Sequence, residues 1–407
     1  MAAANGGASG GRRAGIQLGA LLVAAALCNV AYTILIPFVP TLQHRFGMTP
    51  AAIGLTFGAF SATKALAQPL GGWTVDRLCA RTVAVAGLLV SAAATAALAG
   101  ARDTGEVIGY RILWGLGDGF AAPALYRLAS ALGERDGHEA RVLGWFGSAA
   151  VVGMALGPGV VAAFADTLTF PAAFALGAAL TTGAAVVLWC AVAPDLGRAP
   201  ARHHGADLPE SAPASRPGTW LTVVGFGLLD FVNNFIYAAL EPTLPLYATR
   251  TLRLDARTVS LLFFVGLAAS AAIYAIGGRP VQQHGERAVA TIALFVQAAA
   301  LTAAGASAVA GVLAASFVLL MISQPLVYVA ARSGVTAVSG RGQGRAFGLF
   351  GLISDLGWVT GPIVVTPLLN TMGGSVLLLL ALLAAITGAT AWTLAGRRKA
   401  LRSVVPR

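Results

Sequence analysis

Charged side chains are scarce in this sequence. Asp, Glu, Lys and Arg make up 11% of its 407 residues, against about 25% in an average soluble domain. A soluble globule of this length needs more polar surface, so the scarcity favours an integral membrane protein. The net charge of +11 does not indicate a nucleic-acid partner, because the arginines form short clusters between apolar runs rather than a basic tract with interleaved aromatics.

Groups that perform covalent chemistry or hold metals are also few. The cysteines Cys28, Cys79 and Cys190 are isolated from one another and odd in number, which suits neither a disulfide framework nor a metal site. The sequence carries no motif for a nucleophile, a metal or a phosphate-binding loop. We therefore expect a protein that is not an enzyme, that has no cofactor or metal, and that does not use ATP directly.

Long apolar runs are abundant. A membrane-spanning helix needs about 20 apolar residues. Twelve such runs lie near 15–39, 51–72, 82–100, 105–126, 141–164, 171–193, 219–247, 258–278, 287–305, 308–331, 345–369 and 375–396. The pattern predicts an all-α integral membrane protein with twelve transmembrane helices. We divide it into a six-helix half at 1–193, a polar, proline-rich cytoplasmic linker at 194–218 and a second six-helix half at 219–407.

The two halves resemble each other in sequence. Four residues of the first run recur 205 residues later in the seventh: Asn29, Tyr32, Pro37 and Pro40 return as Asn234, Tyr237, Pro242 and Pro245. Arg127 returns as Arg332 at the same offset. Halves of six helices keep the same orientation, so the repeat predicts two pseudo-symmetric halves around a central cavity.

Lys and Arg are distributed unevenly between the predicted loops. With both termini inside, the inner segments carry 20 of the 27 Lys and Arg residues and the outer loops carry 5; Arg127 and Arg332 count among the inner ones. An excess of Lys and Arg marks the cytoplasmic side. The alanine-rich, arginine-rich composition is typical of a bacterial gene of high GC content. We expect a multi-pass monomer in the lipid bilayer of a bacterial inner membrane, with both termini cytoplasmic.

Four acidic residues fall inside predicted spans: Asp118, Asp230, Glu241 and Asp355. Each ionised acid at a helix centre costs roughly 2.5–3.5 kcal/mol even on the lenient insertion scale. Arg111 and Lys64 are the bases within the predicted spans, as ion-pair partners or proton relays. They leave at least two acids to titrate or to meet a cationic ligand, and we expect no permanent cation beside Asp230 and Glu241.

Spacing groups several of these residues on one helix face. Asp230, Asn234, Tyr237 and Glu241 follow the interval i, i+4, i+7, i+11. We take this stripe, its repeat counterparts Asn29 and Tyr32, and the acids Asp118 and Asp355 as candidate proton-binding and substrate-binding residues. The alternative for each acid is an ion pair or hydrogen bond that only fixes helix packing.

Three motifs carry a family resemblance. The stretch GGWTVDRLCARTV, with Gly72, Asp76, Arg77 and Arg81, resembles the loop signature of the major facilitator superfamily. This resemblance implies that Asp76 braces neighbouring helix ends in one conformation; the second-half copy has Gln282 in its place. Arg111 matches the family's pattern in the fourth span. GMALGPG, with Gly153, Gly157 and Pro158, is similar to the signature of the family's export branch.

The seventh span narrows the resemblance. NNFIYAALEPTLPLY, with Asn234, Glu241 and Pro242, resembles the vesicular amine transporter branch of the drug:proton antiporters. The resemblance and the intramembrane acids predict a proton-coupled secondary transporter that exports small lipophilic compounds, cations among them, by alternating access and at the expense of the proton gradient. The alternatives are a proton-coupled importer of a small polar metabolite and a non-transporting membrane sensor.

The loop charges predict the topology. Reporter fusions after Pro200 and after Arg407 should both report the cytoplasm, and a fusion near Arg253 should report the opposite side. Opposite locations for the fusions after Pro200 and after Arg407 would contradict the arrangement in two halves of six helices.

Overall fold

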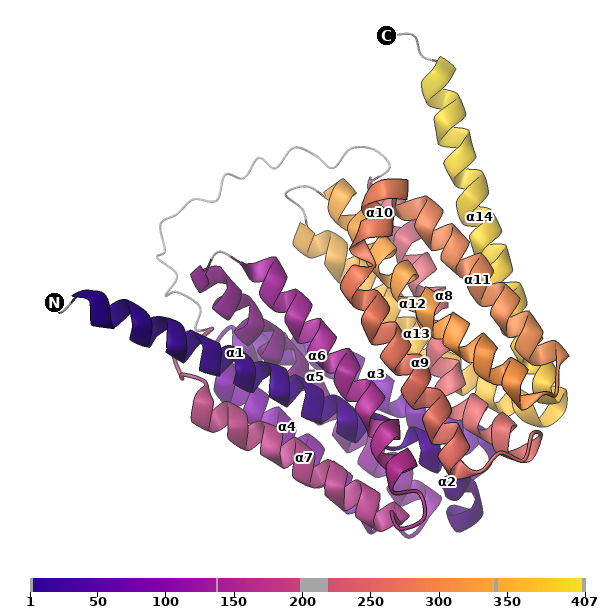
Figure 1. Ribbon diagram of the computed structural model, residues 1–407, viewed down its shortest axis with the longest axis horizontal. Coiled ribbons are helices and arrows are strands. Elements are labelled where there is room, and N and C mark those ends of the chain that lie inside the picture. Colours follow the sequence, from indigo (N-terminus) through magenta and orange to yellow (C-terminus); the bar gives the residue numbers. More distant parts are fainter. Residues whose placement is uncertain (1–2, 137, 198–218, 340–342, 405–407) are drawn as a thin grey trace. The chain divides into compact units, whose positions relative to one another are not determined.

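The structure is a computed structural model that describes residues 3–136, 138–197, 219–339 and 343–404. Within these ranges every regular element is a helix (Figure 1). Residues 198–218, most of the predicted linker, lie outside the described residues. The chain divides into two compact units, one formed by Met1–Met48 with Ala59–Gly205 and the other by Thr49–Gly58 with Ala206–Arg407.

The first unit is a helix bundle. Its elements are α1 (Ala3–Thr33), η1 (Ile36–Phe38), α2 (Val39–Phe46), most of α3 (Pro50–Val75), α4 (Ala80–Ala99), α5 (Thr104–Asp136), α6 (Glu139–Ala163) and α7 (Phe170–Ala191). Helix α4 packs against α5 and α7, and α1 packs against α6 and α7 (Figure 1). Leu21, Leu88, Leu128 and Leu188, from four of these helices, form part of one buried apolar cluster.

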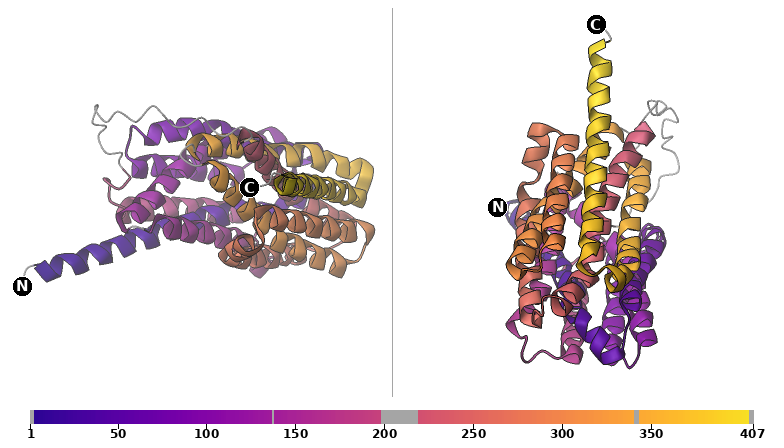
Figure 2. Two further views of the ribbon diagram at one scale, coloured as in Figure 1. Left: turned by 90° about the horizontal axis from the view of Figure 1, so that it is seen from above. Right: turned by 90° about the vertical axis from the view of Figure 1, so that its right-hand side faces the viewer.

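The second unit is also a helix bundle. Its elements are α8 (Thr219–Arg250), α9 (Ala256–Ile276), α10 (Gly278–His284), α11 (Glu286–Ala306), α12 (Ala310–Ser339), α13 (Gln343–Met372), η3 (Gly373–Ser375) and α14 (Val376–Val404). Helix α8 packs along α13 and also contacts α12, whereas α11 lies between α12 and α14 (Figure 2). The acid-bearing helix α8 is therefore held by α12 and α13.

The helices confirm the predicted all-α membrane class. Ten helical segments of the described chain are long and apolar enough to cross a membrane. Each of the twelve predicted runs lies largely on a long helix, although the first continues past the end of α1 at Thr33 through η1 to the start of α2. The two runs outside those ten are on α3 and α5. These helices are less apolar because α3 carries Lys64 and α5 carries Arg111 and Asp118.

Three predicted spans end well inside their helices. The fourth, tenth and twelfth runs were expected to end near 126, 331 and 396, but α5 continues to Asp136, α12 to Ser339 and α14 to Val404. Hydropathy marks where apolar side chains stop, whereas a helix ends only where the backbone leaves the helical conformation. Arg127 and Arg332 therefore lie on helices and not in loops, and this changes what Arg332 can reach.

Pairs of glycines four residues apart bring helix backbones together in both units. In the first unit, a Cβ added to Gly153 of α6 would meet the carbonyl oxygen of Ala26, and one on Gly157 would lie 2.7 Å from the carbonyl oxygen of Val30. Helix α6 continues through the neighbouring Pro158 to its end. Small residues at this spacing permit close approach of membrane helices.

The second unit repeats this contact between α13 and α8. A Cβ on Gly357 would meet the carbonyl oxygen of Phe231, and one on Gly361 would meet that of Phe235. Their positions lie 204 residues after Gly153 and Gly157. The repeated glycines in the sequence thus correspond to a repeated packing contact.

The glycine contact leads to a stability prediction. Gly153→Ala should lower the free energy of unfolding by about 1–3 kcal/mol, because the added methyl group meets the α1 backbone. Gly147→Ala on the same helix is the matched control, since nothing lies within 4 Å of a Cβ there. It should leave stability unchanged or raise it by up to about 1 kcal/mol. Unfolding in detergent measures both, and equal effects would contradict the prediction.

Candidate proton and substrate site

Asp230 of α8 is a fully buried carboxylate that belongs to an ion pair. Its side chain is 0% exposed, and its Oδ2 lies 3.0 Å from Nη1 of Arg332 on α12, whose side chain is 32% exposed. The expectation that no cation lies beside Asp230 was therefore wrong. The error follows from the predicted end of the tenth span, which placed Arg332 in a loop.

Two neutral groups hold the same carboxylate oxygen. Ser354 of α13 donates its hydroxyl hydrogen to Oδ2 of Asp230 at 2.5 Å. Asn234, one turn along α8, donates from Nδ2 to the hydroxyl of Ser354 at 2.8 Å and to Asp230 at 3.5 Å. The predicted pairing of Asp230 with Asn234 on one face is thus present. Ser354 joins them because Gly357 lets α13 approach α8 closely.

The guanidinium of Arg332 lies against aromatic rings. Its Cζ is 3.3 Å from the ring centroid of Tyr328 and 5.1 Å from that of Phe350. Tyr274 of α9 packs edge-on against Tyr328, with ring centroids 5.2 Å apart. The hydroxyl of Tyr274 donates to Oε1 of Gln324 at 3.3 Å. The cation therefore contacts a carboxylate at its tip and lies over two aromatic rings, both of which stabilise it.

The rest of the predicted stripe lies further along α8. Tyr237 is buried and packs edge-on against Trp358 of α13, with ring centroids 5.3 Å apart. Glu241 is 1% exposed and lies about 16 Å from Asp230 along the helix. Asp355 is half-buried on α13 beside Ser354. The stripe is therefore present on α8, and the ion pair with Arg332 lies at its Asp230 end.

The first unit contains a second acid–base pair. Asp118 of α5 accepts a hydrogen bond from the hydroxyl of Ser91 at 2.8 Å, and its Oδ2 lies 3.9 Å from Nζ of Lys64. Both charged side chains are partly exposed. Lys64 is therefore a neighbour of Asp118. The distance between their charged atoms is longer than that between Arg332 and Asp230, and Asp118 is more exposed than Asp230.

Arg111 is completely buried among aromatic rings of the first unit. Its Cζ lies 4.2 Å from the ring centroid of Phe60, 5.0 Å from that of Trp114 and 5.6 Å from that of Tyr32. The candidate residue Asn29 on α1 donates from Nδ2 to the carbonyl oxygen of Ala25 on its own helix at 2.8 Å.

The loop motif after α3 ties helix ends through its last arginine. Arg81 donates from Nη1 to the carbonyl oxygens of Trp189 and Val192, at 3.2 and 3.0 Å, at the end of α7. Asp76 is exposed, and its backbone N–H bonds to the carbonyl oxygen of Gly72. Arg77 lies over the ring of Trp73 at 3.7 Å. A brace by Asp76 remains a prediction, whereas the contact of Arg81 is present.

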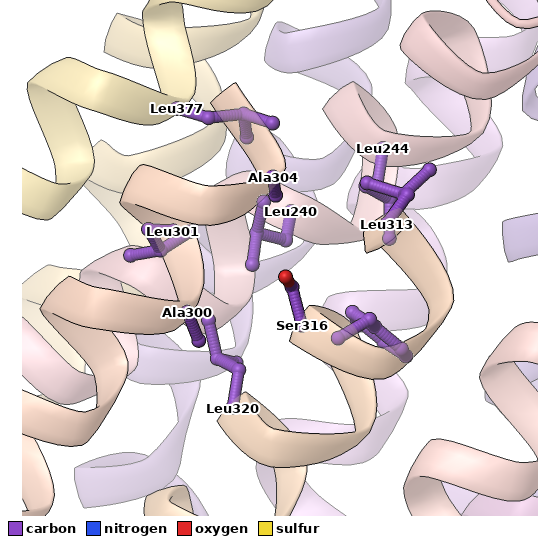
Figure 3. Close-up of a pocket in the computed structure, with 10 residues that line it drawn as sticks. Leu240, Leu244, Ala300, Leu301, Ala304, Leu313, Ser316, Leu320 and Leu377 are labelled. Atoms are coloured by element: carbon purple, nitrogen blue, oxygen red, sulfur yellow. The ribbon is translucent and has the colours of Figure 1, made fainter. Parts of the chain in front are cut away.

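A separate cavity in the second unit is too small for a substrate. It lies between α8, α11, α12 and α14, where Ser316 is the one polar residue among Leu240, Leu244, Ala300, Leu301, Ala304, Leu313, Phe317, Leu320 and Leu377 (Figure 3). Its volume of about 10 Å³ has room for roughly one water molecule. We interpret it as a packing void.

Sequence reasoning missed Arg332, Ser354 and the aromatic residues around them. One signal was available, because Arg332 is the repeat counterpart of Arg127. The counterpart of Asp230 is Ala25, however, and Arg127 instead pairs with Glu134 at 3.1 Å. The repeat thus marked the arginine without indicating its partner.

Comparison with known proteins places these features in a family context. The sequence model of the Major Facilitator Superfamily matches residues 21–229, slightly more than half of the chain. A probable vesicular acetylcholine transporter-B of Danio rerio is 29% identical over 141 residues, which is 33% of this chain and 29% of the relative. A D-galactonate transporter of Escherichia coli O6:H1 is 29% identical over 146 residues, 36% of this chain and 34% of the relative.

A third relative is multidrug resistance protein 1 of Bacillus subtilis, 27% identical over 171 residues, 40% of this chain and 43% of the relative. The chain thus spans less than half the length of the curated relatives it matches. Among solved structures, the human organic anion transporter MFSD10 aligns with a TM-score of 0.68 at 20% identity, over 93% of this chain and 99% of that one. The nucleoside transporter NupG gives 0.75 at 13% identity, over the same shares.

The contacts around Asp230 lead to a prediction. Ser354→Ala should lower the free energy of unfolding by about 1.5–3 kcal/mol, because the buried carboxylate loses a hydrogen bond to a charged group. Thr360→Ala on the same helix is the control, since that hydroxyl donates to Leu356 of its own turn. Thermal unfolding in mild detergent measures the difference. Equal stability of the two variants would show that Ser354 does not hold Asp230.

Proposed function

The chain belongs to the Major Facilitator Superfamily, and we propose that it is a proton-coupled secondary transporter that exports small lipophilic compounds, cations among them, by alternating access. We also propose that it acts as a monomer in a bacterial inner membrane, and the excess of Lys and Arg in the inner segments supports cytoplasmic positions for both termini. Its energy source would be the proton gradient.

The observation that carries the proposal is the buried carboxylate of Asp230. Its Oδ2 accepts from Arg332, Ser354 and Asn234, whereas Oδ1 is buried without a hydrogen-bond partner among the described residues. A buried ionised acid is stable only while a cation and hydrogen bonds offset its desolvation. A proton taken up on Oδ1 would neutralise the group and weaken its hold on Arg332.

This exchange would link a proton to the packing of three helices. Asp230 lies on α8, Arg332 on α12 and Ser354 on α13, so the charge of Asp230 contributes to the contacts among all three. Loss of that charge would favour an arrangement in which α12 is less tightly held. A cation that binds the ionised form would expel the proton, and protonation would expel the cation, which is antiport in its simplest form.

Two further observations support a lipophilic cargo. Aromatic residues flank the polar stripe of α8, including Phe231 and Phe235, whose ring centroids lie 5.9 Å apart, and the Tyr237–Trp358 contact. The similarity to a multidrug resistance protein and to a probable vesicular acetylcholine transporter also favours a drug-like or cationic compound.

A proton-coupled importer of a polar metabolite is the second candidate. The similarity to a D-galactonate transporter favours it, as does the fully buried cation of Arg111 in the first unit. A panel of lipophilic cations, neutral drugs and sugar acids in everted vesicles separates the two. Collapse of the pH gradient by lipophilic cations supports export, and collapse by sugar acids alone would contradict it.

The proton role of Asp230 can be tested directly. Asp230→Asn should abolish substrate-induced proton release from detergent-solubilised protein, because the amide cannot exchange a proton. Binding of a cationic substrate should weaken, since the neutral side chain mimics the protonated acid, which expels the cation.

Asp118→Asn is the control, because Asp118 is the partly exposed acid of the first unit, and its proton release should persist. Glu241→Gln tests the other acid of the stripe. If Glu241→Gln or Asp118→Asn abolishes proton release while Asp230→Asn retains it, the coupling acid is not Asp230.

A further inference from the structure

The surroundings of Arg332 form a site for a planar cation, which the side chain of Arg332 itself fills. A carboxylate lies at the tip of the guanidinium, whose Cζ lies over the ring of Tyr328 at 3.3 Å from its centroid and over that of Phe350 at 5.1 Å. Proteins bind organic cations with this same combination of an acid and aromatic faces. The occupant here belongs to the protein.

The ion pair leaves part of the carboxylate unused. Arg332 reaches Asp230 through one nitrogen, Nη1, and one oxygen, Oδ2. Oδ1 of Asp230 is buried and accepts no hydrogen bond among the described residues. A guanidinium or amidinium group can donate two parallel hydrogen bonds to a carboxylate, which is a stronger and more specific geometry than a single one. A free ligand could therefore satisfy an oxygen that Arg332 does not.

The two partners differ in their access to the exterior of the unit. Asp230 is 0% exposed, whereas the side chain of Arg332 is 32% exposed and carries a flexible stem. Arg332 also lies one residue beyond the predicted apolar end of its span, on the last turns of α12, which continue to Ser339. The arginine can therefore swing away from the pair, while the acid stays in place.

We propose that Asp230, Tyr328 and Phe350 bind the amidinium or guanidinium group of a transported organic cation, and that Arg332 occupies this site until the substrate displaces it. The proposal rests on the function proposed above and names the substrate class of the same site. One cation replaces another of the same chemistry beside the ionised Asp230, and protonation of Asp230 would weaken its hold on either cation. Arg332 then acts as an internal competitor that sets the affinity.

Internal competition has a measurable consequence. The apparent dissociation constant of a ligand equals its intrinsic value divided by the fraction of molecules with an open site. If Arg332 leaves the site open about one-tenth of the time or less, its removal tightens binding by about tenfold or more. The matching ligands are benzamidinium, a flat aromatic amidinium, and benzamide, its uncharged isostere.

The test measures binding of both ligands to purified full-length protein in detergent, at one pH and without a pH gradient. Arg332→Met keeps an unbranched stem and removes the charge, and it should bind benzamidinium about tenfold or more tightly than the wild type. Asp230→Asn combined with Arg332→Met should lose this binding. Benzamide should bind none of the variants measurably better than the wild type.

Arg127→Met is the matched control. Arg127 is the repeat counterpart of Arg332, but it pairs with the exposed Glu134, and Ala25 stands where Asp230 would be. Its replacement should leave benzamidinium affinity unchanged. The proposal is overturned if Arg332→Met binds no tighter than the wild type, if benzamide binds equally well, or if the double variant retains binding.

A second variant covers the case in which Arg332→Met does not fold, since it leaves a buried acid without its cation. Arg332→Lys keeps the charge but loses the planar fork and its stacking, so it should bind benzamidinium more tightly than the wild type; equal or weaker binding overturns the proposal. Tighter benzamidinium binding by Arg332→Met together with intact proton release in Asp230→Asn would sustain this inference and refute the proposed proton role. Unchanged benzamidinium binding by Arg332→Met together with lost proton release in Asp230→Asn would refute this inference and sustain the proton role.

Discussion

The cost of a charge in an apolar surrounding governs the second unit. Asp230 is fully buried, and Arg332 supplies the positive charge that offsets its desolvation. To break such a pair by removing one partner costs about 3–5 kcal/mol, which is a large part of a typical domain's stability of about 5–15 kcal/mol. The positions of α8 and α12 are therefore linked to a single electrostatic contact, and any event that changes the charge of Asp230 changes what holds these helices together.

The pair depends in turn on close helix packing. Serine and asparagine have short side chains, so Ser354 of α13 can reach Asp230 and Asn234 of α8 only where the two backbones nearly touch. Gly357 and Gly361 provide that approach, because a side chain at either position would meet the α8 backbone. Backbone contact made possible by missing side chains thus places the polar groups that hold the carboxylate. Packing and charge are two parts of one arrangement here.

Hydrophobic run length and internal repetition were enough to predict the fold class and the helices. The stripe from Asp230 to Glu241 also followed from helical periodicity. The partners of Asp230 did not, for two physical reasons. Hydropathy ended the tenth span one residue before Arg332, although the helix continues to Ser339. Ser354 lies 124 residues from Asp230 along the chain, and no periodicity within one helix reports which neighbouring helix faces it.

The glycine contacts occur in both halves of the sequence, whereas the buried ion pair occurs in one. Gly153 and Gly157 of α6 have their equivalents in Gly357 and Gly361 of α13, but Ala25 and Arg127 stand where Asp230 and Arg332 form a pair. The glycine contacts that pack the bundle can therefore exist without the buried ion pair. A hybrid gene that encoded the first half twice would retain both glycine packing contacts, but it would have alanine where Asp230 stands. Duplication alone would therefore yield the helix bundle, and a later substitution would have to add the buried carboxylate.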